Sequence, residues 1–248
     1  MSYLSNSYLE SLIDLLEKIK DEETEKLERA AKLMVEAIQN RKRIFGFGCT
    51  HSSLPIQDLV YRAGGLILIN PIFGPGIASL NVRPAQLTSA IERLSGYAQI
   101  LLDNCPIEEG DVLILVSVSG RNAVPVEMAK IASERGIKVI GVTSYEYTKN
   151  VESRHPSGKK MYDFADVVLD NKVPKGDAIV EIESFPIKFT PASGVTSTAL
   201  LHTLVTLVIE ELIKRGIEPP VCVAANVDGS EEHNDRIWKE YSDRIFYM

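Results

Sequence analysis

After Arg43 the sequence alternates short apolar runs with helix-type segments, and this alternation constrains the fold more than any other feature. Runs of this length, rich in Val, Ile and Leu, are typical of strands that are buried on both faces, as in parallel sheets. The segments between them predict helices, so the pattern indicates an α/β fold with a five-stranded parallel sheet. The runs are "RIFGFG" (43–48), "GLILIN" (65–70), "DVLILVSVS" (111–119), "KVIGVTS" (138–144) and "ADVVLD" (165–170).

Two regions flank this core. Apolar residues at helical spacing predict one long amphipathic helix over residues 7–40, and its length implies that part of its apolar stripe packs on another subunit. No repeat or composition break divides the chain. We therefore expect one domain, with a helical segment (1–42), an α/β core (43–215) and a C-terminal extension (216–248) that ends in a short helix.

Within the core, one segment predicts a single helical stretch (84–103) and another, rich in turn residues, predicts loops (145–192). The stretch "TALLHTLVTLVIEELI" predicts a central helix, and with two glutamates and a histidine it is too short for a clean membrane span.

Charge and cysteine content narrow the class of protein. A formal net charge of −7 argues against nucleic-acid or membrane partners, because both need a basic patch. Cys49, Cys105 and Cys222 form neither a zinc spacing nor a disulfide framework, which favours a reducing compartment. The N-terminus lacks the pattern of a signal peptide, so we expect a cytoplasmic protein.

Four segments rich in Ser, Thr and Gly follow the predicted strands or introduce the central helix. They are "GCTHSS" (48–53), "SVSGRN" (117–122), "TSYEYT" (143–148) and "TPASGVTST" (190–198). Ligands of open parallel sheets bind at the carboxyl ends of the strands, where hydroxyls and backbone N–H groups can hold a phosphate. Each segment alone is equally explained by helix capping. Four such segments at one edge favour an anion site.

A nucleotide site does not fit these segments. "GFGCTH" has Gly46 and Gly48, but His51 stands where a dinucleotide fingerprint needs its third glycine. The second predicted strand ends in Asn70 rather than in the acid that binds a ribose. No GxxxxGK[ST] motif occurs in the chain, which excludes a nucleotide P-loop.

The same segments resemble the SIS (sugar isomerase) domain. Its Ser-x-Ser-Gly-x-Thr signature matches "SVSGRN", with Asn122 in place of Thr, and its first-strand loop is similar to "GCTHSS". The likeness covers about residues 35–215 and extends to single-SIS proteins related to phosphoheptose isomerases. It implies a flavodoxin-like three-layer α/β/α sandwich. It also implies a homodimer or homotetramer with a sugar-phosphate site at or near a subunit interface.

From the edge segments and the resemblance we expect a phosphorylated sugar to be the ligand. The predicted substrate-binding residues are Thr50, His51, Ser52, Ser117, Ser119, Gly120, Asn122, Thr143 and Ser144.

Aldose–ketose isomerisation moves a proton between adjacent carbons through an enediol, which requires a base with a pKa near neutrality. His202 lies on a largely apolar helix face, a position that suits a core histidine as well as a base. Its helix is similar to the phosphoheptose isomerase helix that bears the catalytic histidine. Asp58 is either the acid of the pair or a solvated residue, and Arg62 either contacts the substrate or pairs with an acid.

The relatives' carboxylate and metal-binding histidine have no clear counterpart on the helix that carries Asp58, so we expect neither metal nor cofactor. Glu232 and His233 are either a solvated helix start or acid/base groups supplied by a neighbouring subunit. The basic loop 153–160 is either a surface loop or a lid.

These residues predict a sugar-phosphate isomerase that works by proton transfer through an enediol. Two alternatives remain: a non-catalytic sugar-phosphate sensor or regulatory protein, and a lyase or deaminase for an amino-sugar phosphate.

Overall fold

The computed structural model describes residues 3–78 and 82–247, and its centre is a five-stranded parallel sheet with the order β2-β1-β3-β4-β5. The predicted parallel sheet is confirmed. The chain leaves β1 toward one edge and returns to β3 on its other side, so the order reverses between β1 and β3. Ligand sites of open α/β sheets lie at such a reversal. The strands are β1 (Ile44–Gly48), β2 (Ile69–Pro71), β3 (Val112–Val116), β4 (Lys138–Thr143) and β5 (Val167–Asp170).

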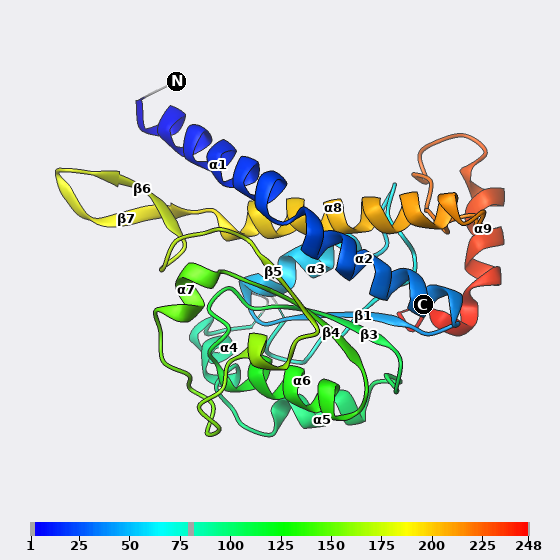
Figure 1. The fold of residues 1–248 in the computed structure, drawn as a ribbon, viewed down its shortest axis with the longest axis horizontal. Helices are drawn as coiled ribbons and strands as arrows, with labels where there is room; N and C mark the ends of the chain where they lie inside the picture. Colours follow the sequence, from blue (N-terminus) through cyan, green and yellow to red (C-terminus); the bar gives the residue numbers. More distant parts are fainter. Residues whose placement is uncertain (1–2, 79–81, 248) are drawn as a thin grey trace.

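Helices cover both faces of the sheet, which confirms the predicted three-layer sandwich (Figure 1). Along β3, Val112, Ile114 and Val116 pack into one core, whereas Leu113 and Leu115 pack into the other. The first layer contains α2 (Thr24–Gln39), α3 (Leu54–Leu59) and α8 (Ser193–Lys214). The second contains α4 (Gln86–Ile91), α5 (Tyr97–Asp103) and α6 (Ala123–Glu134).

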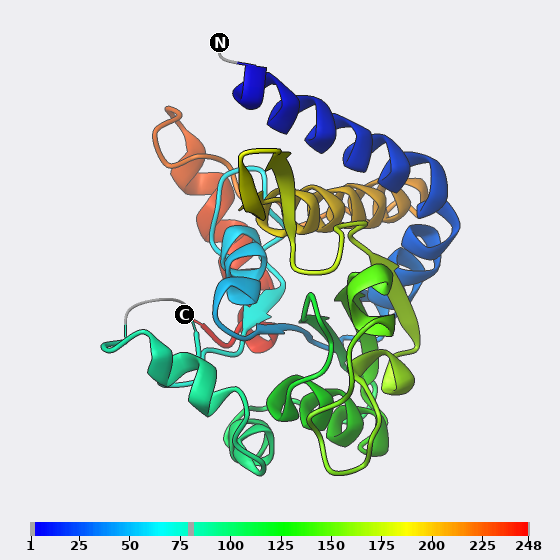
Figure 2. The same cartoon turned by 90° about the vertical axis from the view of Figure 1, so that its left-hand side faces the viewer.

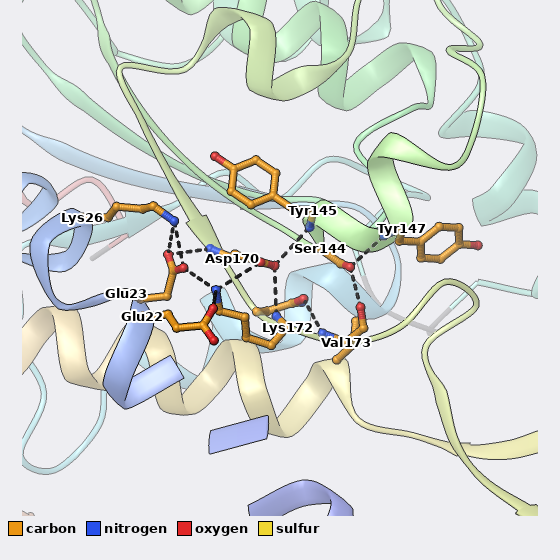
Figure 3. A network of polar contacts seen from close by, with 10 residues as sticks. Glu22, Glu23, Lys26, Ser144, Tyr145, Tyr147, Asp170, Lys172 and Val173 are labelled. Carbon is orange, nitrogen blue, oxygen red and sulfur yellow. Dashed lines mark hydrogen bonds and ion pairs between the residues drawn. The ribbon is translucent and has the colours of Figure 1, made fainter. Parts of the chain in front are cut away.

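The N-terminal segment is two helices rather than the one predicted over 7–40. α1 (Tyr3–Glu22) and α2 are separated by Glu23, and α2 runs in a new direction (Figures 1 and 2). The carboxylate of Glu23 is fully buried and accepts hydrogen bonds from Lys172 Nζ at 2.6 Å and from the Asp170 backbone N–H at 3.0 Å (Figure 3). The helix turns because this buried acid reaches groups at the end of β5. Apolar periodicity does not record such a bend.

An antiparallel hairpin occupies part of the segment that we predicted as loops. β6 (Ala178–Ile182) pairs with β7 (Phe185–Pro191), and the hairpin projects from the sandwich together with α1 (Figures 1 and 2). The hydroxyl of Tyr8 on α1 donates a hydrogen bond to the Pro191 carbonyl at 3.3 Å. The alternation in "AIVEI" was the available strand signal.

Three smaller differences concern element ends. β2 is shorter than predicted because Ile67 N–H bonds to the Pro220 carbonyl of the C-terminal extension, at 3.1 Å, instead of joining the sheet. The segment 84–103 holds α4 and α5 rather than one helix, and they are separated at Gly96, which has φ 87°. α7 (Tyr145–Lys149) follows β4 and lies in the segment that we predicted as loops. The predicted C-terminal helix is present as α9 (Ser230–Glu240).

By length and composition alone, α8 could cross a membrane, because it spans 22 residues. The expectation that its apolar stretch is too short was wrong. However, Leu200, Leu201 and Leu204 are fully buried against α2, α3 and the sheet. The apolar composition of α8 is therefore that of a core helix. The cytoplasmic location stays a prediction.

Candidate functional site

The loop after β1 folds back over the end of its own strand. A Cβ atom on Gly48 would lie 2.2 Å from the Ser52 carbonyl oxygen, so only glycine permits this close return. A short 3₁₀ turn, His51–Ser53, then leads into α3. A Cβ atom on Gly46 would lie 2.7 Å from the Ile56 side chain, so the glycine of β1 also lets α3 sit close to the sheet. Together these contacts place His51 and Ser52 at the point where the strand order reverses.

A cavity of about 380 Å³ opens at this point, and we call it the loop cavity. It lies between the loops after β1 and β3 and the N-terminal end of α8. Its lining residues are His51, Ser52, Leu54, Pro55, Val116, Val118, Asp177, Pro191, Ser193, Gly194, Val195 and Ser197.

A wider cleft of about 750 Å³ adjoins the loop cavity, between α3 and α8. We call it the α3–α8 cleft. Leu54, Gly194 and Val195 line both spaces, so a ligand can extend from one into the other. The remaining lining residues of the cleft are Gln57, Asp58, Thr198 and Ala199.

Asp58, Arg62 and His202 meet beside this cleft, and we call them the acid–base cluster. The Nε2 atom of His202 lies 2.8 Å from Asp58 Oδ2. The other carboxylate oxygen of Asp58 lies 2.6 Å from Arg62 Nη1. Two elements far apart in sequence thus bring a histidine, an acid and an arginine into contact. The structure unites the predicted Asp58 and His202, and it places Arg62 with the acid.

The contact with Asp58 favours one neutral tautomer of His202. In that tautomer Nε2–H donates to Asp58, and Nδ1, which has no hydrogen-bond partner among the described residues, carries the lone pair. Arg62 Nη1 lies 3.5 Å from the same ring nitrogen, Nε2. The side chains of His202 and Asp58 are 38% and 43% exposed, so the free nitrogen can be reached from solvent. This geometry supplies a general base.

The N-terminus of α8 is filled by an acid of the same chain. Asp177, held at φ 68°, accepts hydrogen bonds from the Ser193 backbone N–H at 2.7 Å and from the Ser193 hydroxyl at 2.6 Å. It also accepts from the Ala192 N–H at 3.1 Å. Asp177 therefore caps the first turn of α8 and occupies the N–H groups of Ala192 and Ser193. Sequence reasoning missed this role of Asp177.

Thr143 and Ser144, two of the predicted binding residues, lie inside the protein and do not line the loop cavity. Both are fully buried. The Thr143 hydroxyl donates to the Val118 carbonyl at 3.0 Å, which fixes the loop after β3. The Ser144 hydroxyl donates to the Val173 carbonyl at 2.5 Å and accepts from the Tyr147 N–H at 2.9 Å (Figure 3). These hydroxyls are used by the backbone and are not available to a ligand.

Four of the predicted binding residues belong to the loop after β3, and they differ in where their side chains lie. Val116 and Val118 line the loop cavity, so the alternation of an extended chain turns the buried Ser117 to the other face. Gly120 has φ 59°, and a Cβ atom there would lie 2.9 Å from Thr148 Oγ1, so close packing requires the glycine. Asn122 Oδ1 accepts a hydrogen bond from Arg154 at 2.9 Å. Ser117 and Asn122 are therefore not lining residues of the loop cavity.

Two other predicted residues, Thr50 and Ser119, do not line the loop cavity. Thr50, at φ 53°, donates its backbone N–H to the Ile77 carbonyl at 2.7 Å and does not line the loop cavity. Ser119 is partly exposed, three residues after Val116.

Glu232 and His233 lie on α9, which packs at the end of the molecule away from the loop cavity (Figure 1). His233 Nε2 lies 2.9 Å from the Val221 carbonyl and donates a hydrogen bond to it. The structure does not bring either residue to the site of its own chain. Their contribution from a neighbouring subunit stays a prediction.

Among the described residues, Asp58 and His202 alone supply metal-donor atoms at the acid–base cluster, which is fewer than the three protein ligands of a catalytic zinc site. Within residues 3–78 and 82–247, no group of three or more His, Cys, Asp or Glu side chains is arranged to hold a metal ion.

Comparisons with known proteins agree on one family. The model of the SIS domain matches residues 7–144. The UPF0309 protein of Streptomyces avermitilis is 46% identical over 246 residues, which cover 99% of this chain and 98% of that protein.

Two solved structures share the fold. The phosphoheptose isomerase GmhA of Neisseria gonorrhoeae is 21% identical with a TM-score of 0.55, and the match covers 83% of this chain and 96% of that one. The Vibrio vulnificus NanR protein, solved in complex with ManNAc-6P, is 15% identical with a TM-score of 0.53, covering 98% of this chain and 70% of that one.

Proposed function

This chain belongs to the SIS-domain family, and from that premise we propose that it binds a phosphorylated sugar and interconverts its aldose and ketose forms. The observation that carries the proposal is the acid–base cluster beside the α3–α8 cleft, which adjoins the loop cavity at the strand-order reversal. A base at one end of a connected space and hydroxyls at the other suit a substrate with a reactive carbonyl and a distant phosphate.

In this proposal the phosphate lies at the loops after β1 and β3. Ser52 offers a hydroxyl from the cavity wall, and Ser119 with Gly120 follows the Val118 that also lines it. The phosphate does not lie at the first N–H groups of α8, because Asp177 already accepts hydrogen bonds from those of Ala192 and Ser193. The sugar carbons then extend past Val195 into the α3–α8 cleft, toward His202.

The reaction is a proton transfer between neighbouring carbons. His202 Nδ1 takes a proton from the carbon next to the carbonyl, the C–H electrons form the C=C bond of an enediolate, and the former carbonyl oxygen takes a proton from solvent to give the enediol. His202 then gives its proton to the former carbonyl carbon, while the hydroxyl on the neighbouring carbon releases its proton to solvent and becomes the new carbonyl. Asp58 holds the imidazole in the tautomer that leaves Nδ1 free, and the charge of Arg62 stabilises negative charge on the enediol oxygens.

We also propose that a second copy of the chain covers the open side of the site. Apolar side chains are exposed at the cavity rim, where Leu54 is 45% and Val195 is 44% exposed. Others are exposed on the two elements that project from the sandwich, α1 and the β6–β7 hairpin: Leu9, Ile13, Phe185 and Ile187. Light scattering on the eluting protein is expected to give a dimer or tetramer mass. A Phe185→Ser, Ile187→Ser double variant is expected to shift that mass toward the monomer.

The experiment that tests the proposed function is a panel of sugar phosphates that includes sedoheptulose 7-phosphate, fructose 6-phosphate and ribulose 5-phosphate. Calorimetry measures binding, and NMR follows aldose–ketose interconversion in the same samples. The proposal expects binding and interconversion for at least one compound. Binding without interconversion would make the protein a sugar-phosphate sensor. No binding to any phosphorylated sugar, with a folded protein, would contradict both functions.

A further inference from the structure

Three arginines belong to segments that meet at the start of α6, where the Val124 N–H donates to the carbonyl of Glu92, next to Arg93, at 3.1 Å. We call them the arginine cluster. Arg93 follows α4, Arg121 belongs to the loop after β3, and Arg154 lies between α7 and β5. The Arg154 backbone N–H donates to the Arg121 carbonyl at 2.8 Å, and Arg154 Nη1 donates to Asn122 Oδ1 at 2.9 Å. Arg154 is largely exposed, but partial desolvation of its guanidinium lowers its pKa, and the nearby charges of Arg121 and Arg93 lower it further.

The cluster lacks direct ion-pair partners. Within the part of the chain that the structure describes, none of the three guanidinium groups has a carboxylate oxygen within 4.0 Å. The Nε atom of Arg121 is buried and makes no hydrogen bond to any described residue. Like charges repel, and a buried N–H without an acceptor is unfavourable. Both features are relieved by an anion.

The neighbouring acids do not balance these charges. Glu92 acts on Arg154, but burial raises the pKa of Glu92, and a hydrogen bond from Asn122 only partly opposes this. Glu127 is engaged elsewhere, because its carboxylate accepts from the Gly96 N–H at 2.8 Å and lies 3.7 Å from His155 Nε2. Three positive charges therefore face one carboxylate.

We propose that the arginine cluster is an anion-binding subsite for a phosphate or carboxylate group. The planar guanidinium presents paired N–H donors that match these groups, and such bonds are stronger than those between neutral partners. Arg121 follows Ser119 by two residues, so their Cα atoms lie at most about 7 Å apart. The group that binds here belongs to the same ligand, which is then a sugar phosphate with a second phosphate or an acid group. That identification of the ligand rests on the proposed function.

A matched pair of ligands tests the subsite by calorimetry on the full chain. Fructose 6-phosphate and fructose 1,6-bisphosphate differ by one phosphate, and inorganic phosphate serves as the free anion. The wild type is expected to bind the bisphosphate about tenfold more tightly than the monophosphate. Arg154→Gln and Arg121→Gln are expected to abolish most of this preference, with little change in monophosphate binding.

The control variant is Arg29→Gln, because Arg29 is an exposed residue of α2 whose Nη2 reaches only the Asp166 carbonyl, at 3.4 Å. Arg154 is exposed, so its variant is expected to fold even where Arg121→Gln lowers the Tm. A third outcome is that both cluster variants weaken the binding of inorganic phosphate while the wild type shows no preference between the two sugars. This result would support the subsite, with a free anion as its ligand.

Arginine-independent binding of all three probes would overturn the subsite and leave the proposed function standing. If the bisphosphate and inorganic phosphate bind only when the arginines are present, and no monophosphorylated sugar binds, the subsite is supported and the proposed function is contradicted.

Discussion

Two ionic clusters in this protein are built from the same kinds of residue but differ in their surroundings. The acid–base cluster joins Asp58 to His202, with both side chains about 40% exposed beside a cleft. The network at the α1–α2 junction joins Glu23 to Lys172, whose side chains are 0% and 10% exposed (Figure 3). Burial lowers the pKa of Lys172, but its hydrogen bonds to Glu23 and Glu22 raise it by more.

The difference teaches which cluster can do chemistry. In the network every charge has a partner inside the protein, so its groups fix the direction of α1 and the end of β5. In the acid–base cluster one ring nitrogen of His202 remains without a partner among the described residues, next to a space that a ligand can fill. The predictions below separate the two roles, from the largest expected effect to the smallest.

Replacing His202 by Gln should lower sugar-phosphate turnover about a thousandfold, because glutamine cannot act as a base. Binding of the sugar phosphate should change little, since the phosphate contacts lie at the other end of the site. Steady-state rates and calorimetry provide both numbers. His233→Gln is the matched control, and an equal loss of turnover in that variant would mean that α9 of a second copy supplies the base.

Replacing Asp58 by Asn should lower turnover about a hundredfold, because the amide no longer favours the His202 tautomer with a free Nδ1. Glu218→Gln, which disturbs an exposed pair with Arg236 at 2.5 Å, should leave turnover unchanged. A full rate in the Asp58 variant would show that its contact with His202 is only structural.

Replacing Glu23 by Gln should lower the free energy of unfolding by about 3 kcal/mol, because Lys172 stays mostly buried without its closest partner. Chemical denaturation measures the change. Lys26→Met removes the more exposed partner of the same acid and should cost under about 1 kcal/mol. Neither variant should alter turnover per folded molecule, and a specific loss of turnover in Glu23→Gln would erase the distinction between the clusters.

Replacing Ser52 by Ala should weaken sugar-phosphate binding about tenfold, the value of one hydrogen bond to a charged group. Ser242→Ala is the control, because its hydroxyl donates to the Lys239 carbonyl at 3.0 Å outside the site. An unchanged Kd would place the phosphate away from the loop after β1.

The sheet and the three layers could be predicted because a parallel strand needs apolar residues on both faces, which leaves a local signal. The place of His202 on a helix was also predictable, since apolar spacing marks a regular element, whereas its part in a reaction stays a prediction. Asp58 followed from its position on the helix after the first loop, but its contact with His202 depends on how α3 packs against α8.

Other features depend on single polar contacts that no local pattern records. The bend at Glu23 needs Lys172, which is 149 residues away in the sequence. The sequence shows hydroxyls at Thr143 and Ser144, but not that backbone carbonyls already accept their hydrogen bonds. In the same way, Asp177 caps a helix from outside it. Residue type showed which groups at these positions can form hydrogen bonds, whereas the choice of partner required the fold.

The central claim is that His202 transfers a proton on a bound sugar phosphate. Incorporation of deuterium from D₂O, at saturating concentrations of the compound that binds most tightly, tests it directly by NMR. The account predicts deuterium at the carbon next to the carbonyl with the wild type and none above background with His202→Gln. Tight binding without deuterium in the wild type, or equal incorporation with His202→Gln, would contradict it.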